Sequence, residues 1–212
     1  MGRRGFFVTG TDTNVGKTVV SALLCAALDA YYWKPIQTGS LMGTDREQVI
    51  AWSGIESSQT FPEAYIFEDP VSPHLAARRA NRPISLQKIS FPSLPGDRAL
   101  IAEGAGGVLV PIGDHEFMTD VMRHVGLPVL LVTRTVLGTI NHTLLSLAAL
   151  KAAGLTIRGV VMVGDENKDN REAVERYGAV PVIGRVPMLA EITPHALKHV
   201  FHTSLDIHAL HP

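Results

Sequence analysis

The chain has 212 residues, of which 46% are hydrophobic and 18% are charged, and its formal net charge is −1 at pH 7. This composition argues against a disordered chain, and the near-neutral charge gives no electrostatic footprint for DNA or RNA. Apolar runs stay well below the about 18 residues that a membrane span needs, and a single cysteine, Cys25, excludes a disulfide-built secreted fold. We therefore expect one soluble, cytoplasmic domain over residues 1–212, with a buried thiol and no nucleic-acid or membrane partner.

The first predicted elements are a strand over residues 5–8 and a helix over residues 17–30, joined by a glycine-rich turn. The turn ends in Gly16-Lys17-Thr18, the tail of a Walker A phosphate loop, although its first glycine, Gly10, stands one position before the usual place. Backbone N–H groups of such a loop and of the following helix bind phosphate oxygens. The lysine reaches the β and γ phosphates, and the threonine hydroxyl binds Mg²⁺.

The next predicted elements are strand, helix and strand in turn, at residues 31–36, 45–52 and 98–102. Asp45 follows a turn and is a candidate helix N-cap, whereas Glu103 directly ends an apolar strand. A carboxylate at the C-terminal end of a parallel strand points into the crevice where ligands bind. Together with Thr18, the two carboxylates form a candidate Mg²⁺ site, because Mg²⁺ prefers oxygen ligands.

The rest of the chain continues the alternation. Strand, helix, strand, helix and strand are expected at residues 128–133, 139–153, 157–163, 168–177 and 181–186. Several of these strands are apolar on both faces, which is typical of a buried parallel sheet. We therefore expect an α/β fold with a doubly wound, mostly parallel sheet. The proline- and serine-rich segment 60–95 is interpreted as an excursion carrying short helices.

Motifs along nearly the whole chain resemble those of the dethiobiotin synthetase family, in the same order. They are the loop at residues 10–18, Lys34-Pro35-Ile36-Gln37-Thr38-Gly39, Ser72-Pro73-His74, Glu103-Gly104-Ala105-Gly106-Gly107 and Gly138-Thr139-Ile140-Asn141-His142. The resemblance implies a P-loop NTPase-type fold with a deviant Walker A loop. It also implies a homodimeric cyclo-ligase of biotin biosynthesis, which uses ATP and Mg²⁺ to join 7,8-diaminononanoate (7,8-diaminopelargonate) and CO₂ into dethiobiotin, with release of ADP and phosphate.

The resemblance also implies roles for individual residues of this sequence. Lys34 and Lys17 would be catalytic, and Thr18, Asp45 and Glu103 would hold Mg²⁺. The residues implied to contact the substrate are Thr11, Thr38 and Asn141, the last from the helix of the neighbouring subunit. The residues implied to contact the nucleotide are Thr13, Asn14, Val15, Gly16, Lys17, Thr18, Asp45, Glu103, Gly104, Ala105, Gly106, Pro187, Met188 and Leu189.

Two segments depart from the family pattern. Residues 29–33 are shorter than the matching segment of relatives and lack its customary glycine turn. Relatives often carry an Asn for base recognition after the strand at 157–163, whereas this chain has Gly164-Asp165. We therefore hypothesise that the protein tolerates nucleotides other than ATP.

Other classes of P-loop protein remain alternatives. A switch ATPase of the partitioning or cell-division class carries a signature lysine where this chain has Asp12. A GTPase carries Asn-Lys-x-Asp, whereas the segment 167–170 ends in Asn170, which cannot accept both guanine donors as a carboxylate does. A non-catalytic interaction protein with a retained nucleotide fold is a third alternative, and the intact lysines and carboxylates argue against it.

Overall fold

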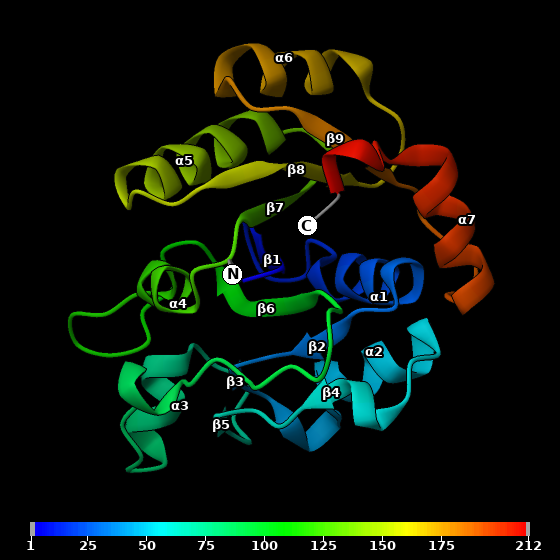
Figure 1. Ribbon diagram of the computed structural model, residues 1–212. Coiled ribbons are helices and arrows are strands. Elements are labelled where there is room, and N and C mark those ends of the chain that lie inside the picture. The colour runs from blue at the N-terminus through cyan, green and yellow to red at the C-terminus, as the bar shows by residue number, and fades with distance from the viewer. Residues whose placement is uncertain (1–2, 211–212) are drawn as a thin grey trace.

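A computed structural model of the chain describes residues 3–210. Its centre is a seven-stranded sheet in the order β4-β2-β6-β1-β7-β8-β9, in which neighbouring strands are all parallel (Figure 1). The strands are β1 (Gly5–Gly10), β2 (Tyr31–Trp33), β4 (Thr60–Phe61), β6 (Leu100–Gly107), β7 (Val129–Arg134), β8 (Ile157–Val163) and β9 (Val182–Val186). The strand order reverses beside β1, so the doubly wound parallel sheet expected from the sequence is confirmed. Ligands of such sheets bind at this reversal point.

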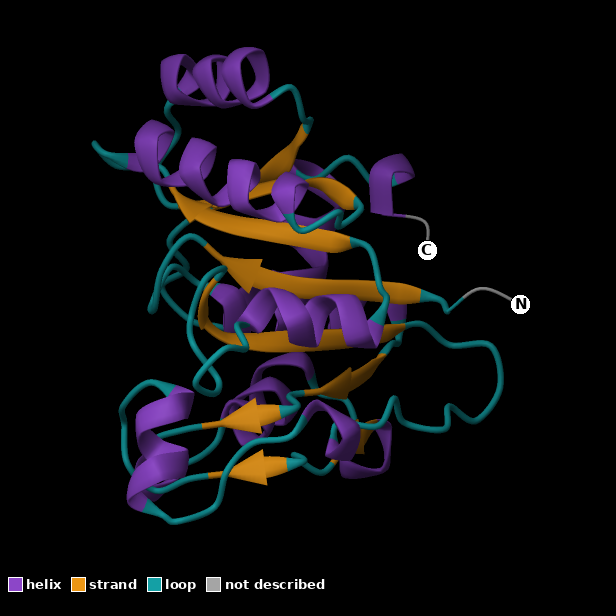
Figure 2. Cartoon of the chain, turned by 90° about the vertical axis from the view of Figure 1, so that its left-hand side faces the viewer, coloured by secondary structure: helices purple, strands orange, loops and turns teal. Residues whose placement is uncertain are grey.

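Helices cover both faces of the sheet. The helices on one face are α1 (Lys17–Leu28), α2 (Asp45–Ser53) and α7 (Pro194–Ser204). The helices on the other face are α3 (Pro73–Arg79), α4 (Met118–Val125), α5 (Thr139–Ala152) and α6 (Lys168–Gly178). Figure 2 views the molecule from the side of α4 and α5, which lie in front of the strands. No helix within residues 3–210 combines the length and the apolar character that a bilayer span requires.

The central strand β1 contributes side chains to the core on both faces of the sheet. Phe7 packs into the apolar cluster beneath α4 and α5, whereas Phe6 and Val8 pack into the cluster beneath α1. All three side chains are buried, because successive residues of a strand point to opposite faces and both faces are covered. Cys25 of α1 belongs to the second cluster, and burial raises the pKa of its thiol, as a buried inert thiol requires.

The expected strand at residues 31–36 is divided between two sheets. β2 pairs with β6 in the main sheet, whereas β3 (Ile36–Gln37) pairs with β5 (Tyr65–Ile66) in a small second sheet. Pro35 stands between them and has no N–H to donate to a ladder, but its carbonyl accepts the Tyr65 N–H at 3.0 Å. The division places Lys34 at the junction of the two sheets, so the sequence interpretation of one continuous strand was wrong.

The short segment before Lys34 folds without the customary glycine. α1 ends at Leu28, two residues before the expected end, and Asp29 takes the left-handed conformation at its C-cap with φ 50°. Asp29 is held there by Arg98, 2.8 Å away, and by the Gln59 amide, which donates to Oδ1 at 2.8 Å. An aspartate tolerates this conformation better than most residues.

Three further expectations on local structure need correction. Glu103 does not end a strand, because β6 continues to Gly107. Asp45 is the first residue of α2 rather than its N-cap: Thr44 caps the helix in a capping box with Glu47. No bounds were predicted for the helices α4 and α7, although α7 has a recognisable start, a Thr193 N-cap followed by Pro194. The excursion at 60–95 does carry a short helix, α3, together with the 3-10 helix Leu86–Lys88.

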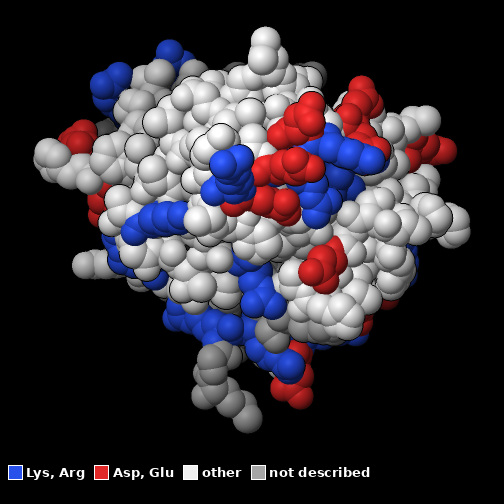
Figure 3. Space-filling view, turned by 90° about the horizontal axis from the view of Figure 1, so that it is seen from above, with Lys and Arg blue, Asp and Glu red and all other residues white. Residues whose placement is uncertain are grey.

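Charged side chains gather on the outer face formed by α6. Figure 3 shows acidic and basic groups side by side on this face rather than in separate blocks. Arg171 and Glu175, one helical turn apart, have an N–O separation of 3.5 Å. The same helix buries Val174 against the sheet layer below, so the charged residues are the solvent face of an amphipathic helix.

Candidate active site

The loop between β1 and α1 follows the Walker A geometry. Gly16 is the N-cap of α1 in the left-handed conformation, with φ 102°. A Cβ at this position would lie 3.0 Å from the Val163 side chain, so both backbone conformation and space favour glycine. The N-terminus of α1 therefore opens directly at the end of the loop, where backbone N–H groups can bind phosphate oxygens.

A cavity of about 440 Å³ opens over this loop. The lining residues that the sequence singled out are Thr13, Asn14, Gly16, Lys17, Thr18, Lys34, Thr38, Asp45, Glu103, Ala105 and Gly106. These residues are drawn from the Walker loop, the segment after β2, the start of α2 and β6. The fold thus brings four separate sequence motifs to one cavity at the switch point of the sheet.

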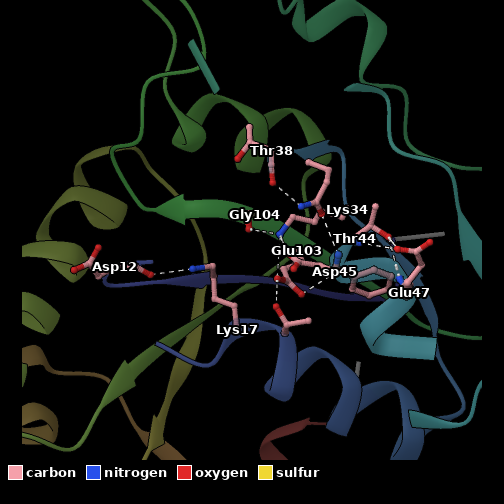
Figure 4. Close-up of polar contacts among 12 residues, drawn as sticks. Asp12, Lys17, Lys34, Thr38, Thr44, Asp45, Glu47, Glu103 and Gly104 are labelled. Atoms are coloured by element: carbon pink, nitrogen blue, oxygen red, sulfur yellow. Dashed lines mark hydrogen bonds and ion pairs between the residues drawn. The ribbon is translucent and has the colours of Figure 1, made fainter. Parts of the chain in front are cut away.

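Lys34 lies between the two carboxylates of this cavity (Figure 4). Its Nζ forms an ion pair with Asp45, lies 3.2 Å from Glu103 Oε1 and lies 3.5 Å from the Gly104 carbonyl oxygen. Burial alone would lower the pKa of Lys34, but the charges of Glu103 and Asp45 outweigh it and raise the pKa above 10.5. Lys34 is therefore an ammonium at neutral pH, although its side chain is only 4% exposed.

Glu103 has different partners on its two oxygens. Oε1 accepts from the Thr18 hydroxyl at 3.0 Å and from Lys34, whereas Oε2 accepts from the Tyr32 hydroxyl at 3.1 Å. Burial, followed by the charge of Glu103, raises the pKa of the Tyr32 phenol well above its usual range, so Tyr32 remains a donor. The carboxylate is consequently held by groups from α1, β2 and the segment after β2.

Lys17 turns toward its own loop rather than toward the carboxylates. Its Nζ donates to the Asp12 carbonyl oxygen at 2.9 Å (Figure 4). Burial lowers its pKa from 10.5 to about 8, and the charge of Lys34 acts in the same direction. The Walker lysine is thus a buried cation without a carboxylate in hydrogen-bond contact, poised for an anion that enters the loop.

The residues around Glu103 suit a small divalent cation. A hydroxyl (Thr18) and two carboxylates (Asp45 and Glu103) are the hard oxygen donors that Mg²⁺ takes in proteins. Within residues 3–210 no group of three or more His, Cys, Asp or Glu side chains could hold a metal by itself. A cation at this place would therefore complete its coordination with phosphate oxygens and water.

Comparison with known proteins decides the family. A sequence model described as an AAA domain matches residues 4–196. An ATP-dependent dethiobiotin synthetase from Rhodopseudomonas palustris is 45% identical over 194 residues, which cover 92% of this chain and 90% of that relative. The same enzyme from Agrobacterium fabrum is 45% identical over 196 residues, covering 92% of each chain. The chain belongs to the dethiobiotin synthetase family. The expectation of an enzyme of this family is thereby confirmed.

Solved structures confirm the fold class of this dethiobiotin synthetase family member. A ParA family ATPase from Chlorobium tepidum superposes over 100% of both chains with a TM-score of 0.58 at 14% identity. A MinC:MinD cell division complex from Aquifex aeolicus matches 92% of this chain and 86% of the other with a TM-score of 0.52 at 12% identity. At such identities the likeness concerns the P-loop NTPase-type fold and not the activity.

Some residues singled out by the resemblance to the dethiobiotin synthetases lie outside the main cavity. Thr11 and Val15 line a second cavity of about 150 Å³, together with Gly138, Thr139 and His142 at the start of α5. Gly104 contributes its carbonyl oxygen to Lys34 without lining the main cavity. Four further residues also border neither cavity: Asn141, on the exposed start of α5, and Pro187, Met188 and Leu189, which follow β9.

Other residues line or support the main cavity although the sequence did not assign them to the site. They are Val19, Gln37, Gln48 and Trp52, which line it, and Tyr32, which contacts Glu103 from outside. Gln37 connects two motifs, because its Oε1 accepts the Asp45 N–H at 3.2 Å and its Nε2 donates to the Thr38 carbonyl at 2.8 Å. Its place inside the Lys-Pro motif was a usable signal. Tyr32 gave no such signal, because an aromatic residue on a strand normally indicates core packing.

Proposed function

We propose that this protein is a cytoplasmic dethiobiotin synthetase. It would join 7,8-diaminononanoate and CO₂ into dethiobiotin, with ATP and Mg²⁺, and release ADP and phosphate. The identity to relatives of that name over nine-tenths of the chain supports the proposal. The observation that carries it is the buried Lys34 ammonium, which shares one cavity with the Walker lysine Lys17 and with the carboxylates of Asp45 and Glu103.

The proposed reaction has three steps. An amine of the substrate attacks CO₂ and loses a proton, which gives a carbamate. A carbamate oxygen then attacks the γ-phosphate of ATP and expels ADP, which gives a carbamic–phosphoric anhydride. The second amine attacks the carbonyl carbon of the anhydride, closes the five-membered cyclic urea and expels phosphate. Because both amines belong to one molecule, proximity assists ring closure.

Two lysines would meet the main electrostatic difficulty of this reaction. The carbamate and the triphosphate are both anions, so their approach costs energy unless cations stand between them. Lys17 extends along the phosphate loop, and Lys34 enters the cavity from the other side, beside β6 (Figure 4). We assign Lys17 to the phosphates and Lys34 to the carbamate and the transferring phosphoryl group. Both assignments require the ammonium forms.

Mg²⁺ would be held by Thr18, Asp45 and Glu103. These groups provide the oxygen donors described above, and Lys34 forms ion pairs with both carboxylates. When bound, the metal would supply charge neutralisation at the β and γ phosphates. The protein groups themselves orient the nucleotide: the loop backbone fixes the phosphates, and the Thr18 hydroxyl stands at the first turn of α1.

The substrate carboxylate is assigned to the start of α5 in a homodimer. The N-terminus of a helix suits an anion, and Asn141 lies exposed in the first turn of this fourteen-residue helix. Val136 and Leu137, just before it, are apolar and strongly exposed. Exposed apolar residues beside this proposed anion site support burial of the start of α5 against a second subunit. The start of α5 would then complete the cavity of that second subunit. Thr38 and Thr11 would contact the rest of the substrate.

Phosphate release tests the proposal directly. The purified protein is supplied with MgATP and bicarbonate, with and without 7,8-diaminononanoate. Release that requires the diamine and is matched by dethiobiotin formation supports the proposed function. Steady release that is indifferent to the diamine contradicts it and favours the switch ATPase alternative.

A further inference from the structure

Tyr32 approaches the candidate metal ligand Glu103 from the neighbouring strand. Tyr32 lies in β2, beside β6, and pairs with Ile101 in the register of the two strands. Tyr32 and Ile101 both belong to the apolar cluster beneath α1. Because residues two apart on a strand share a face, Glu103 also points toward α1, where Thr18 lies in the first turn of the helix. The Tyr32 ring is completely buried, and its hydroxyl lies 3.1 Å from Glu103 Oε2.

The hydrogen bond from Tyr32 distinguishes the two oxygens of Glu103. Oε2 is directed toward Tyr32 at the rear of the site, whereas Oε1 accepts from Thr18 at 3.0 Å and from Lys34 at 3.2 Å. Rotation of the carboxylate plane would break all three contacts at once. Tyr32 thereby fixes the orientation of the carboxylate with one oxygen toward the cavity, and it does so with a ring that packing already holds in place.

We propose that Tyr32 is a positioning residue for the metal site, holding Glu103 so that Oε1 is presented to Mg²⁺ beside the Thr18 hydroxyl. This inference rests on the Mg²⁺ site of the proposed function. Tyr32 touches neither cavity, so its effect reaches the metal only through Glu103. Hydrogen-bond partners of metal ligands commonly change metal affinity by about 10- to 100-fold when they are removed.

The chain contains a matched control on the same strand. Tyr31 is also buried, and its hydroxyl donates to the Pro95 carbonyl oxygen at 3.1 Å. Its side chain packs in the cluster on the opposite face of the sheet from α1. Tyr31→Phe therefore deletes the same atom from another buried tyrosine, with a hydrogen bond of the same length, but away from Glu103. A general loss of β2 packing would affect both variants alike.

The test measures ADP binding to the wild type, Tyr32→Phe and Tyr31→Phe at a series of Mg²⁺ concentrations, after circular dichroism has shown that each is folded. The Mg²⁺ midpoint is the Mg²⁺ concentration at which the gain in ADP affinity that Mg²⁺ produces is half complete. We expect this midpoint to rise about tenfold in Tyr32→Phe. In Tyr31→Phe it should stay at the wild-type value. In turnover assays of Tyr32→Phe, the Mg²⁺ requirement should change more than the rate at saturating Mg²⁺. Introducing Tyr32→Phe into Glu103→Gln should shift the Mg²⁺ midpoint no further.

Three results would overturn the inference: an unchanged midpoint in Tyr32→Phe, an equal shift in Tyr31→Phe, or ADP binding by the wild type that does not depend on Mg²⁺. The proposed function is judged separately by whether the wild type forms dethiobiotin from the diamine. A wild type that forms dethiobiotin, with an Mg²⁺ midpoint that Tyr32→Phe leaves unchanged, would remove the role of Tyr32 and retain the function.

Discussion

Lys34 and Glu103 form an ion pair of 3.2 Å in which both side chains are almost completely buried. The two residues are 69 positions apart in the sequence. The pair exists because β2 and β6 are neighbours in the sheet and Lys34 directly follows β2. It connects the stability of the fold with the charge of the site.

Lys34→Met should destabilise the protein and abolish dethiobiotin formation. Removal of the ammonium leaves Glu103 and Asp45 without their shared cation, and breaking a buried ion pair from one side costs about 3 kcal/mol. Urea denaturation measures the loss, with Lys198→Met on the exposed face of α7 as the matched control. Adding Glu103→Gln to Lys34→Met should recover part of the stability and none of the activity. Equal stability of Lys34→Met and the wild type would contradict this account of the pair.

Lys17 should make the stability of the ligand-free protein depend on pH above neutrality. Its folded pKa of about 8 lies below the ordinary 10.5, so between these values the unfolded chain binds more protons than the folded one. The contribution of Lys17 to folding stability therefore increases as the pH rises through 8. Relative to Lys17→Met, the wild type should gain about 2 kcal/mol between about pH 7 and pH 9.5.

Urea denaturation of both proteins at the two pH values measures this gain, and the comparison cancels groups that both share. Lys198→Met should show no such change relative to the wild type, because Lys198 is exposed. A difference between the wild type and Lys17→Met that is the same at both pH values would show that burial does not penalise the Lys17 charge.

Nucleotides other than ATP should support turnover. Gly164 has φ 132°, and a Cβ there would lie 2.4 Å from Thr135 Oγ1, so no side chain can read the base from this position. The nearby amides have structural partners: Asn167 caps α6, and Asn170 donates to the Thr135 carbonyl at 2.9 Å. Dethiobiotin formation should therefore be measurable with CTP and GTP as well as ATP. Strict use of ATP would refute the hypothesis.

The proposed homodimer can be tested by subunit complementation. Lys34→Ala should inactivate the cavity, and Asn141→Asp should repel the substrate carboxylate from the start of α5. If each site combines the cavity of one subunit with α5 of the other, refolding a mixture of the two inactive variants creates heterodimers with one intact site. Activity should then return to the mixture. Continued inactivity, with heterodimers shown to be present, would place both residues in the same subunit's site.

The strand–helix alternation and the site motifs were accessible from sequence because each has a local signal. The Walker tail, the Lys-Pro motif and the Glu103 segment are recognisable wherever they lie, and apolar runs indicated the parallel sheet. The break at Pro35 was readable in principle, because proline cannot donate to a ladder. The pairing of Ile36–Gln37 with Tyr65–Ile66 depends on contacts between distant segments, which no periodicity reveals.

The contacts within the site were less accessible. The sequence placed Asp45 and Glu103 in one candidate metal site, but it did not indicate that Lys34 would join them or that Tyr32 would hold Glu103. Those contacts depend on β2 lying beside β6, which is a property of the folded sheet. Likewise, the helix α4 contains few residues with a strong helix signal, and it forms where its apolar side packs beneath the sheet.

In the proposed function, this protein builds a cyclic urea from a diamine, CO₂ and ATP. The most direct measurement supplies ¹³C-bicarbonate, MgATP and 7,8-diaminononanoate, and follows dethiobiotin by mass spectrometry and ADP by chromatography. We expect ¹³C in the ring carbonyl and one ADP for each dethiobiotin formed. ADP formation without labelled dethiobiotin, or at a rate that the diamine does not change, would contradict it.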